Sequence, residues 1–142
     1  MPYALFIIPF SLMVLTQAIK LAVDGIRGSF TLKNLFGHYG GMPSAHTTFT
    51  VSVTTMMAIR YGLDSGLFAI SLIFTAIVIR DAIGLRSMVS KHALAINKLN
   101  KVTKQKDGLP VLREDFGHSI AEVLVGAIWG VLATYIINSV LT

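Results

Sequence analysis

The sequence predicts an all-α membrane protein, a bundle of about four transmembrane helices, and three observations lead to this fold class. Hydrophobic residues make up 54% of the 142 residues and charged residues only 13%, compared with about 25% charged residues in soluble domains. The mean hydropathy is +0.69. Four segments are long and apolar enough to cross a hydrocarbon core, which takes about 20 helical residues. We therefore treat residues 1–142 as a single integral-membrane domain.

The predicted spans cover residues 3–23, 44–61, 66–83 and 118–141. The first is not interpreted as a signal peptide, because no basic region precedes it and no small-residue cleavage site follows its core. The second is the least apolar, being rich in Thr and Met. Thr hydroxyls can bond back to the preceding helical turn, so they do not exclude a membrane helix.

Two polar segments connect these spans. Residues 24–43 contain five glycines and end in a proline, which is typical of a loop. Residues 87–114 are polar and basic, and their apolar positions lie largely on another helical face from their lysines. This pattern predicts an amphipathic helix, either on the membrane surface or as a cytosolic extension of the third span. The Lys-Asp-Gly-Leu-Pro stretch at 106–110 ends that helix.

Basic residues gather on one side of the predicted bundle. Of the 12 Lys and Arg residues, two lie between the first and second spans, and eight lie from the end of the third span to the start of the fourth. Lys20 is near the same side, and Arg60 is on the other. Because cytosolic loops carry an excess of Lys and Arg, we expect this side to face the cytosol. The net charge of +5 is thereby attributed to the membrane flank and not to nucleic-acid binding.

Ionisable and hydrogen-bonding residues converge at this same face. They are Gln17, Lys20, Asp24 and Arg27 at the end of the first span, Ser44 and His46 at the start of the second, Arg80, Asp81 and Arg86 at the end of the third, and His118 and Glu122 at the start of the fourth. Several Lys and Arg residues at the water–lipid boundary make an anion site. Gly40 and Gly41 precede the second span, where glycines permit close backbone approach and free amides favour phosphate.

The two histidines that begin spans suggest acid and nucleophile roles. Glu122, four residues after His118, can reach back and hold its imidazole in one tautomer. These residues do not require a metal or cofactor. The absence of cysteine excludes thiolate metal sites, disulfides and a thiol nucleophile.

At these residues the sequence resembles the type 2 phosphatidic acid phosphatase superfamily, which includes the vanadium haloperoxidases, and in particular its short divergent membrane branch. The family pattern is KxxxxxxRP, then PSGH, then SRxxxxxHxxxD. Lys20 and Arg27 have the first spacing, followed by Gly28 in place of proline. The PSAH sequence at 43–46 matches the second motif, with Ala45 for glycine.

The third motif is matched more loosely by LREDFGHSIAE. It contains His118, with Glu122 for aspartate, and Arg113 lies five residues before His118 where the family has six. A stretch at about 87–110 lengthens the gap before this motif. The resemblance covers about residues 17–130, and the four spans would correspond to the catalytic core of the usual six-helix bundle.

The resemblance implies a lipid phosphatase. His118 would be the nucleophile that forms a phosphohistidine, Glu122 would orient it, and His46 would protonate the leaving alcohol. The phosphoryl oxygens would be clamped by Lys20, Arg27 and Arg113, with Ser44 and the Gly41 backbone nearby, and Arg80 or Arg86 is an alternative to Arg113. The substrate would be a lipid phosphomonoester or pyrophosphate.

Other interpretations remain open at this stage. Departures from the motifs at Gly28, Ala45, Arg113 and Glu122 also suit a non-catalytic membrane protein that binds anionic lipid or an assembly partner. A small transporter or channel subunit is disfavoured, because no span carries midmembrane charges in a repeat pattern. Gly126 and Gly130 have the spacing for close helix packing, either within the chain or between copies in a homo-oligomer.

Overall fold

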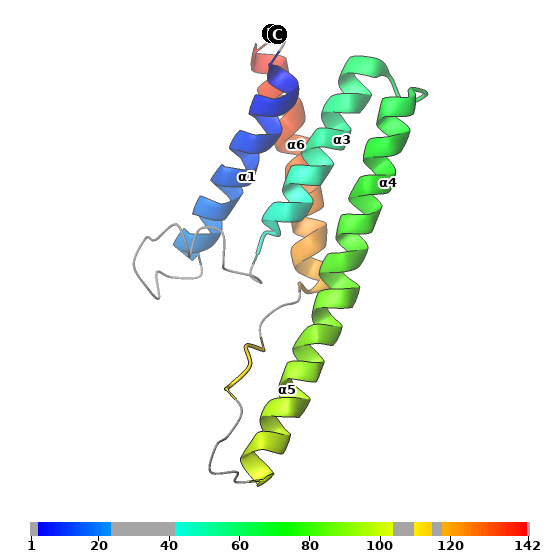
Figure 1. Cartoon of the computed structure of the whole chain (residues 1–142). Coiled ribbons are helices and arrows are strands. Elements are labelled where there is room, and N and C mark those ends of the chain that lie inside the picture. The colour runs from blue at the N-terminus through cyan, green and yellow to red at the C-terminus, as the bar shows by residue number, and fades with distance from the viewer. Residues whose placement is uncertain (1–2, 24–41, 104–109, 115–117, 142) are drawn as a thin grey trace.

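The computed structural model describes residues 3–23, 42–103, 110–114 and 118–141, and within them the chain is helical with no β-strand. In order, the elements are α1 (Ala4–Val23), α3 (Ala45–Tyr61), α4 (Gly66–Arg80), a π-helical segment (Asp81–Leu85), α5 (Arg86–Thr103) and α6 (Ile120–Leu141). They form one bundle from which α5 projects (Figure 1). This architecture confirms the predicted all-α membrane bundle.

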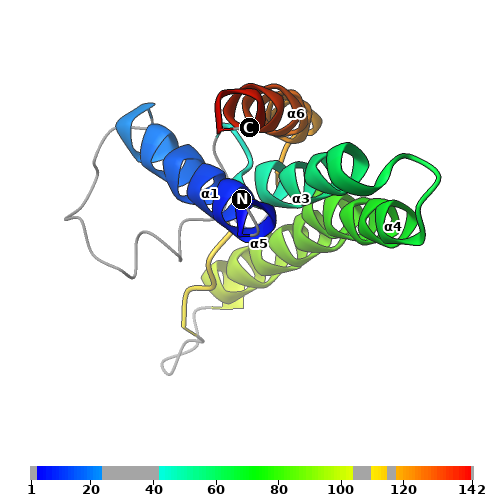
Figure 2. The same ribbon diagram turned by 90° about the horizontal axis from the view of Figure 1, so that it is seen from above.

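Helix α3 is the centre of the bundle and contacts α1, α4 and α6 (Figure 2). Its buried hydroxyls find partners on neighbouring helices. The hydroxyls of Thr54 and Thr75 lie 2.9 Å apart, and Thr134 donates to Ser52 over 2.6 Å. A helix surrounded by protein can carry such polar groups, because each bond satisfies a group that lipid would leave unpaired. This explains why the second predicted span is the least apolar.

Two of the described helical stretches are long and apolar enough to span a membrane, namely Gly66–Val102 and Ile120–Leu141. Ala4–Lys20 is a shorter apolar helix. Many large apolar side chains on these helices are exposed, including Phe6 at 77% and Ile70 at 68%. Exposed apolar surface on this scale is expected where lipid, and not water, is the solvent.

The third predicted span does not end at residue 83. Helix α4 continues through the π-helical segment into α5, giving one long rod (Figure 1). The basic amphipathic helix is therefore an extension of that span, the second of the two predicted alternatives. Residues 110–114 run back along it, since Asn97 donates to the Leu112 carbonyl over 2.7 Å and accepts the Leu112 amide over 2.9 Å.

The π-helical segment changes the hydrogen-bond register where α4 meets α5. The Arg86 amide bonds to the Asp81 carbonyl, five residues back, and the Arg86 side chain donates to the Asp81 carboxylate over 2.7 Å. In an α-helix that amide would bond to Ala82. The Ala82 carbonyl instead accepts the amide of His118 over 3.2 Å. The π-helical register thus leaves the Ala82 carbonyl available to His118, and this bond connects the rod to the segment before α6.

Glycines in α6 allow it to approach α3 closely. A Cβ atom added to Gly126 would lie 2.7 Å from the Ser44 carbonyl oxygen, and one added to Gly130 would lie 2.9 Å from that of Thr48. The Thr48 hydroxyl also donates to the Gly126 carbonyl over 3.1 Å. Of the two interpretations of this glycine pair, the structure shows packing within the chain.

Candidate active site

His118 lies immediately before α6 and is 7% exposed. Its amide is bound by Ala82, and its Nδ1 lies 2.8 Å from a carboxylate oxygen of Glu122. A carboxylate can only accept hydrogen bonds, so a neutral ring bound in this way carries its proton on Nδ1. The lone pair is then on Nε2. The ring is therefore fixed in the tautomer that a nitrogen nucleophile requires.

Glu122 also caps the helix that carries it. Its carboxylate accepts the Ser119 amide over 3.3 Å, while the Ser119 hydroxyl accepts the Glu122 amide over 3.2 Å. This reciprocal pair is a capping box, which fixes the first turn of α6. The Ser-x-x-Glu spacing at 119–122 is the sequence signature of such a box, but Ser119 was not among the predicted site residues. One carboxylate thus orients the histidine and stabilises the helix start.

The start of α3 is held against the start of α6. Ser44 is fully buried, and its hydroxyl accepts the Thr47 amide over 3.4 Å and the Thr47 hydroxyl over 3.0 Å. The Ser44 amide donates to the Glu122 carbonyl over 3.1 Å. The two helix N-termini are therefore adjacent, and the positive ends of their dipoles add at one place.

His46 lies in the first turn of α3, where its side chain is exposed. It interacts electrostatically with Arg86, His118, Lys20 and Asp81. Lys20 is at the end of α1 and only 2% exposed, which is unusual for lysine. Charged or ionisable side chains from α1, the α4–α5 rod and the segment before α6 therefore act on His46. The combination of two histidines and two cations suits the binding of an anionic group and proton transfer to it.

The other residues predicted to bind phosphate either lie away from His46 or fall outside the described residues. Arg80 is exposed at the end of α4, and it is Arg86 that acts electrostatically on His46. Arg113 is exposed in the segment beside α5, where the Glu114 carbonyl accepts the Ser90 hydroxyl. Arg27 and Gly41 lie outside the described residues. The roles of these four residues stay predictions.

Within the described ranges, no three His, Asp or Glu residues are grouped so as to hold a metal ion. The one close pair of such side chains described above is His118 with Glu122. Its carboxylate is already engaged by the histidine ring and by the Ser119 amide.

Comparisons with known proteins place the chain in a family. The model of the Divergent PAP2 family matches residues 2–133. The uncharacterized membrane protein YuiD of Bacillus subtilis is 33% identical in an alignment of 137 positions, with 87% of this chain and 87% of that protein covered. No solved structure matches. The family match includes every residue assigned to the site, from Lys20 in α1 to Glu122 in α6.

Proposed function

Because this chain belongs to the divergent PAP2 family, we propose that it is a lipid phosphatase. It hydrolyses a phosphomonoester or pyrophosphate on a membrane lipid, without a metal, through a phosphohistidine at His118. The observation that carries the proposal is the buried His118 ring, which Glu122 holds in one tautomer and which interacts electrostatically with His46. The assignment of individual residues is part of the proposal.

The first step is attack by the His118 Nε2 lone pair on phosphorus. A P–N bond forms while the bond from phosphorus to the leaving oxygen breaks. His46, protonated at that moment, gives its proton to the leaving oxygen, so that an alcohol or a lipid monophosphate departs. Protonation of a leaving group by a positioned acid typically contributes 10²–10⁴-fold to the rate.

The second step is hydrolysis of the phosphohistidine. His46, now neutral, accepts a proton from a water molecule, whose oxygen attacks phosphorus. The P–N bond breaks, inorganic phosphate leaves, and the His118 lone pair is restored. Glu122 stays bound to Nδ1 in both steps and offsets the positive charge that the ring develops as the P–N bond forms.

Cations and helix dipoles stabilise the charge on the phosphoryl oxygens. Lys20 supplies a full positive charge, Arg86 supplies one that it shares with the Asp81 carboxylate, and the first turns of α3 and α6 supply partial charges. Buried charged donors act strongly on such oxygens, because water does not screen them. The nearly complete burial of Lys20 fits this role better than that of a flank lysine that extends toward water.

The position of the site favours a lipid substrate. The site lies at the ends of apolar helices, where a lipid head group would reach it from the membrane plane. Phosphatidate, phosphatidylglycerophosphate and polyprenyl pyrophosphate all satisfy this chemistry. The excess of basic residues at the same ends supports a cytosolic orientation.

A second candidate function is a non-catalytic membrane protein that keeps the fold and binds anionic lipid. The observation that favours it is Ala45, which stands where the motif has glycine and is 6% exposed in the first turn of α3. A methyl group there reduces the backbone freedom that glycine would give this turn. Binding of phosphate without turnover is the result that this alternative predicts.

The experiment is a panel assay of purified protein in mixed micelles. We expect release of inorganic phosphate from at least one of the three lipid phosphates named above. Vanadate, which mimics five-coordinate phosphorus, should inhibit it, and His118→Ala should abolish it. If the folded protein binds these lipids but releases no phosphate from any of them, the non-catalytic alternative is correct.

A further inference from the structure

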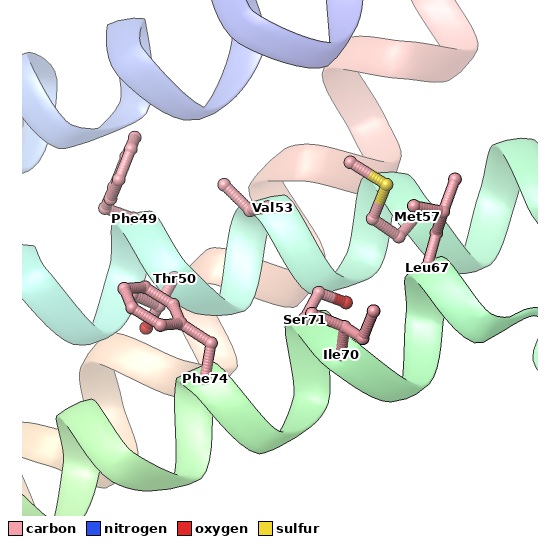
Figure 3. Close-up of a pocket in the computed structure, with 8 residues that line it drawn as sticks. All are labelled: Phe49, Thr50, Val53, Met57, Leu67, Ile70, Ser71 and Phe74. Carbon is pink, nitrogen blue, oxygen red and sulfur yellow. The ribbon is translucent and has the colours of Figure 1, made fainter.

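An apolar groove lies on the surface of the bundle between α3 and α4 (Figure 3). Its volume is about 270 Å³, and it is lined mainly by Phe49, Val53 and Met57 of α3 and Leu67, Ile70 and Phe74 of α4. The two hydroxyls in it are committed to backbone carbonyls. Thr50 donates to His46 over 3.2 Å, and Ser71 donates to Phe68 over 2.8 Å. The groove therefore offers hydrocarbon-like walls.

The length of the groove matches one membrane leaflet. Phe49 and Met57 are eight residues apart on α3, which at 1.5 Å per residue is about 12 Å. Half of a hydrocarbon core is about 15 Å. Neighbouring side chains on α4, such as Ile70 and Phe74, are more than half exposed. A hydrocarbon chain could therefore enter sideways from the membrane.

The groove begins beside the candidate general acid. Phe49 follows His46 by three residues and so lies on the same helical face, and the Thr50 hydroxyl is bonded to the His46 carbonyl. The nucleophile His118 precedes α6, and its amide bonds to the Ala82 carbonyl, which lies eight residues past Phe74 along the rod formed by α4 and α5. The groove therefore begins within one helical turn of the acid on α3, whereas the nucleophile is bound about two turns beyond the groove on the rod.

Phosphoryl transfer imposes a direction on the substrate. The attacking and leaving atoms lie roughly in line on opposite sides of phosphorus. In a lipid phosphate the leaving oxygen carries the hydrocarbon. The hydrocarbon must then depart on the side of His46 and away from His118. That is the side on which the groove begins.

We propose that this groove binds one hydrocarbon chain of the lipid phosphate that is cleaved at His118. The inference rests on the proposed function and adds to it a binding site for the hydrocarbon chain of the substrate. The substrate is a phosphate ester of a long-chain alcohol or lipid whose chain runs from His46 along α3 toward Met57. The chain aligns the leaving oxygen with the acid.

The test compares two variants that each introduce a phenylalanine on α4. Ser71→Phe fills the groove, into which the Ser71 side chain points (Figure 3). Ile73→Phe is the matched control, because Ile73 is 61% exposed and is not part of the groove lining. Hexadecyl phosphate and butyl phosphate serve as substrates, since they share the same leaving-group chemistry and differ in chain length.

We expect Ser71→Phe to lower kcat/KM for hexadecyl phosphate on the order of tenfold, the effect of losing about two methylene contacts. The kcat/KM of Ser71→Phe for butyl phosphate should be unchanged. The kcat/KM of Ile73→Phe should be unchanged for both esters. Equal effects of the two variants on hexadecyl phosphate would show the groove inference to be wrong. Failure of the wild-type protein to cleave these esters and every lipid phosphate of the panel would refute the proposed function itself.

A binding measurement does not depend on turnover or on the stability of Ser71→Phe. His118→Ala protein is irradiated with hexadecyl phosphate that carries a diazirine on its chain, and the crosslinked residues are mapped by mass spectrometry. We expect labels at groove residues such as Val53 and Ile70, which excess unlabelled hexadecyl phosphate removes. Equal labelling by a diazirine-bearing hexadecane would mean that the groove holds bulk lipid chains only, and would overturn the inference.

Discussion

Replacement of Gly126 by alanine should separate the two helix starts that carry the site. The new Cβ would lie 2.7 Å from the Ser44 carbonyl oxygen and 3.2 Å from the Ser44 nitrogen. Both atoms are backbone, so α6 must move away from α3. That movement strains two bonds at this contact, from the Ser44 amide to Glu122 and from the Thr48 hydroxyl to Gly126, each 3.1 Å long.

The expected loss of stability follows from these contacts. Overpacking of a tight interface costs about 1–3 kcal/mol, and weakening a buried hydrogen bond costs about 1 kcal/mol more. Alanine regains up to about 1 kcal/mol of helix propensity relative to glycine. The free energy of unfolding should therefore fall by about 1–3 kcal/mol for Gly126→Ala.

The assay is reversible unfolding in mixed micelles, followed by circular dichroism. Gly66→Ala is the matched control, because nothing lies within 4 Å of a Cβ atom built at Gly66. It should be neutral or slightly stabilising. If Gly126→Ala is as stable as Gly66→Ala, the close approach of α6 to Ser44 does not exist in the protein and the reasoning fails.

Three further predictions concern the chemistry and its orientation. Glu122→Gln should lower kcat on lipid phosphates about 10- to 100-fold, because a hydrogen bond to a charged group is worth about 1.5–3 kcal/mol; unchanged kcat would remove the orienting role of Glu122. His46→Ala should slow alkyl phosphates about 10²–10⁴-fold and partly spare an activated aryl phosphate, and equal losses on both would contradict its role as acid. Lys101→Cys, in a chain without native cysteine, should react with a membrane-impermeant maleimide only from the cytosolic side, and labelling only from outside would invert the orientation.

Much of the fold could be predicted because its determinants are local or compositional. Apolar segments of sufficient length and a glycine-rich connection indicate membrane helices whatever their partners. The adjacency of the helix starts near His46 and His118 followed from topology, because both helices begin at the same face. The four-residue spacing of His118 and Glu122 also predicted a contact that the structure contains.

Other features depend on tertiary contacts, which cannot be read from the order of residues alone. The π-helical register at Asp81–Leu85 shifts one hydrogen bond, and its consequence, the bond from His118 to Ala82, joins residues distant in sequence. The low apolar content of α3 is explained by its contacts with α1, α4 and α6, which only the structure shows. The choice among Arg80, Arg86 and Arg113 likewise depends on tertiary placement; Arg86 acts electrostatically on His46, and the clamp role of each arginine stays a prediction.

The central claim is that His118 carries the phosphoryl group during turnover. The most direct measurement is rapid mixing with a radiolabelled lipid phosphate, an alkaline quench that preserves phosphohistidine, and mapping of the labelled residue. We expect acid-labile label on His118 of the wild-type protein, persistence of that label in His46→Ala, and none in His118→Ala. Normal turnover by His118→Ala, or turnover by the wild-type protein with label on another residue, would contradict the account.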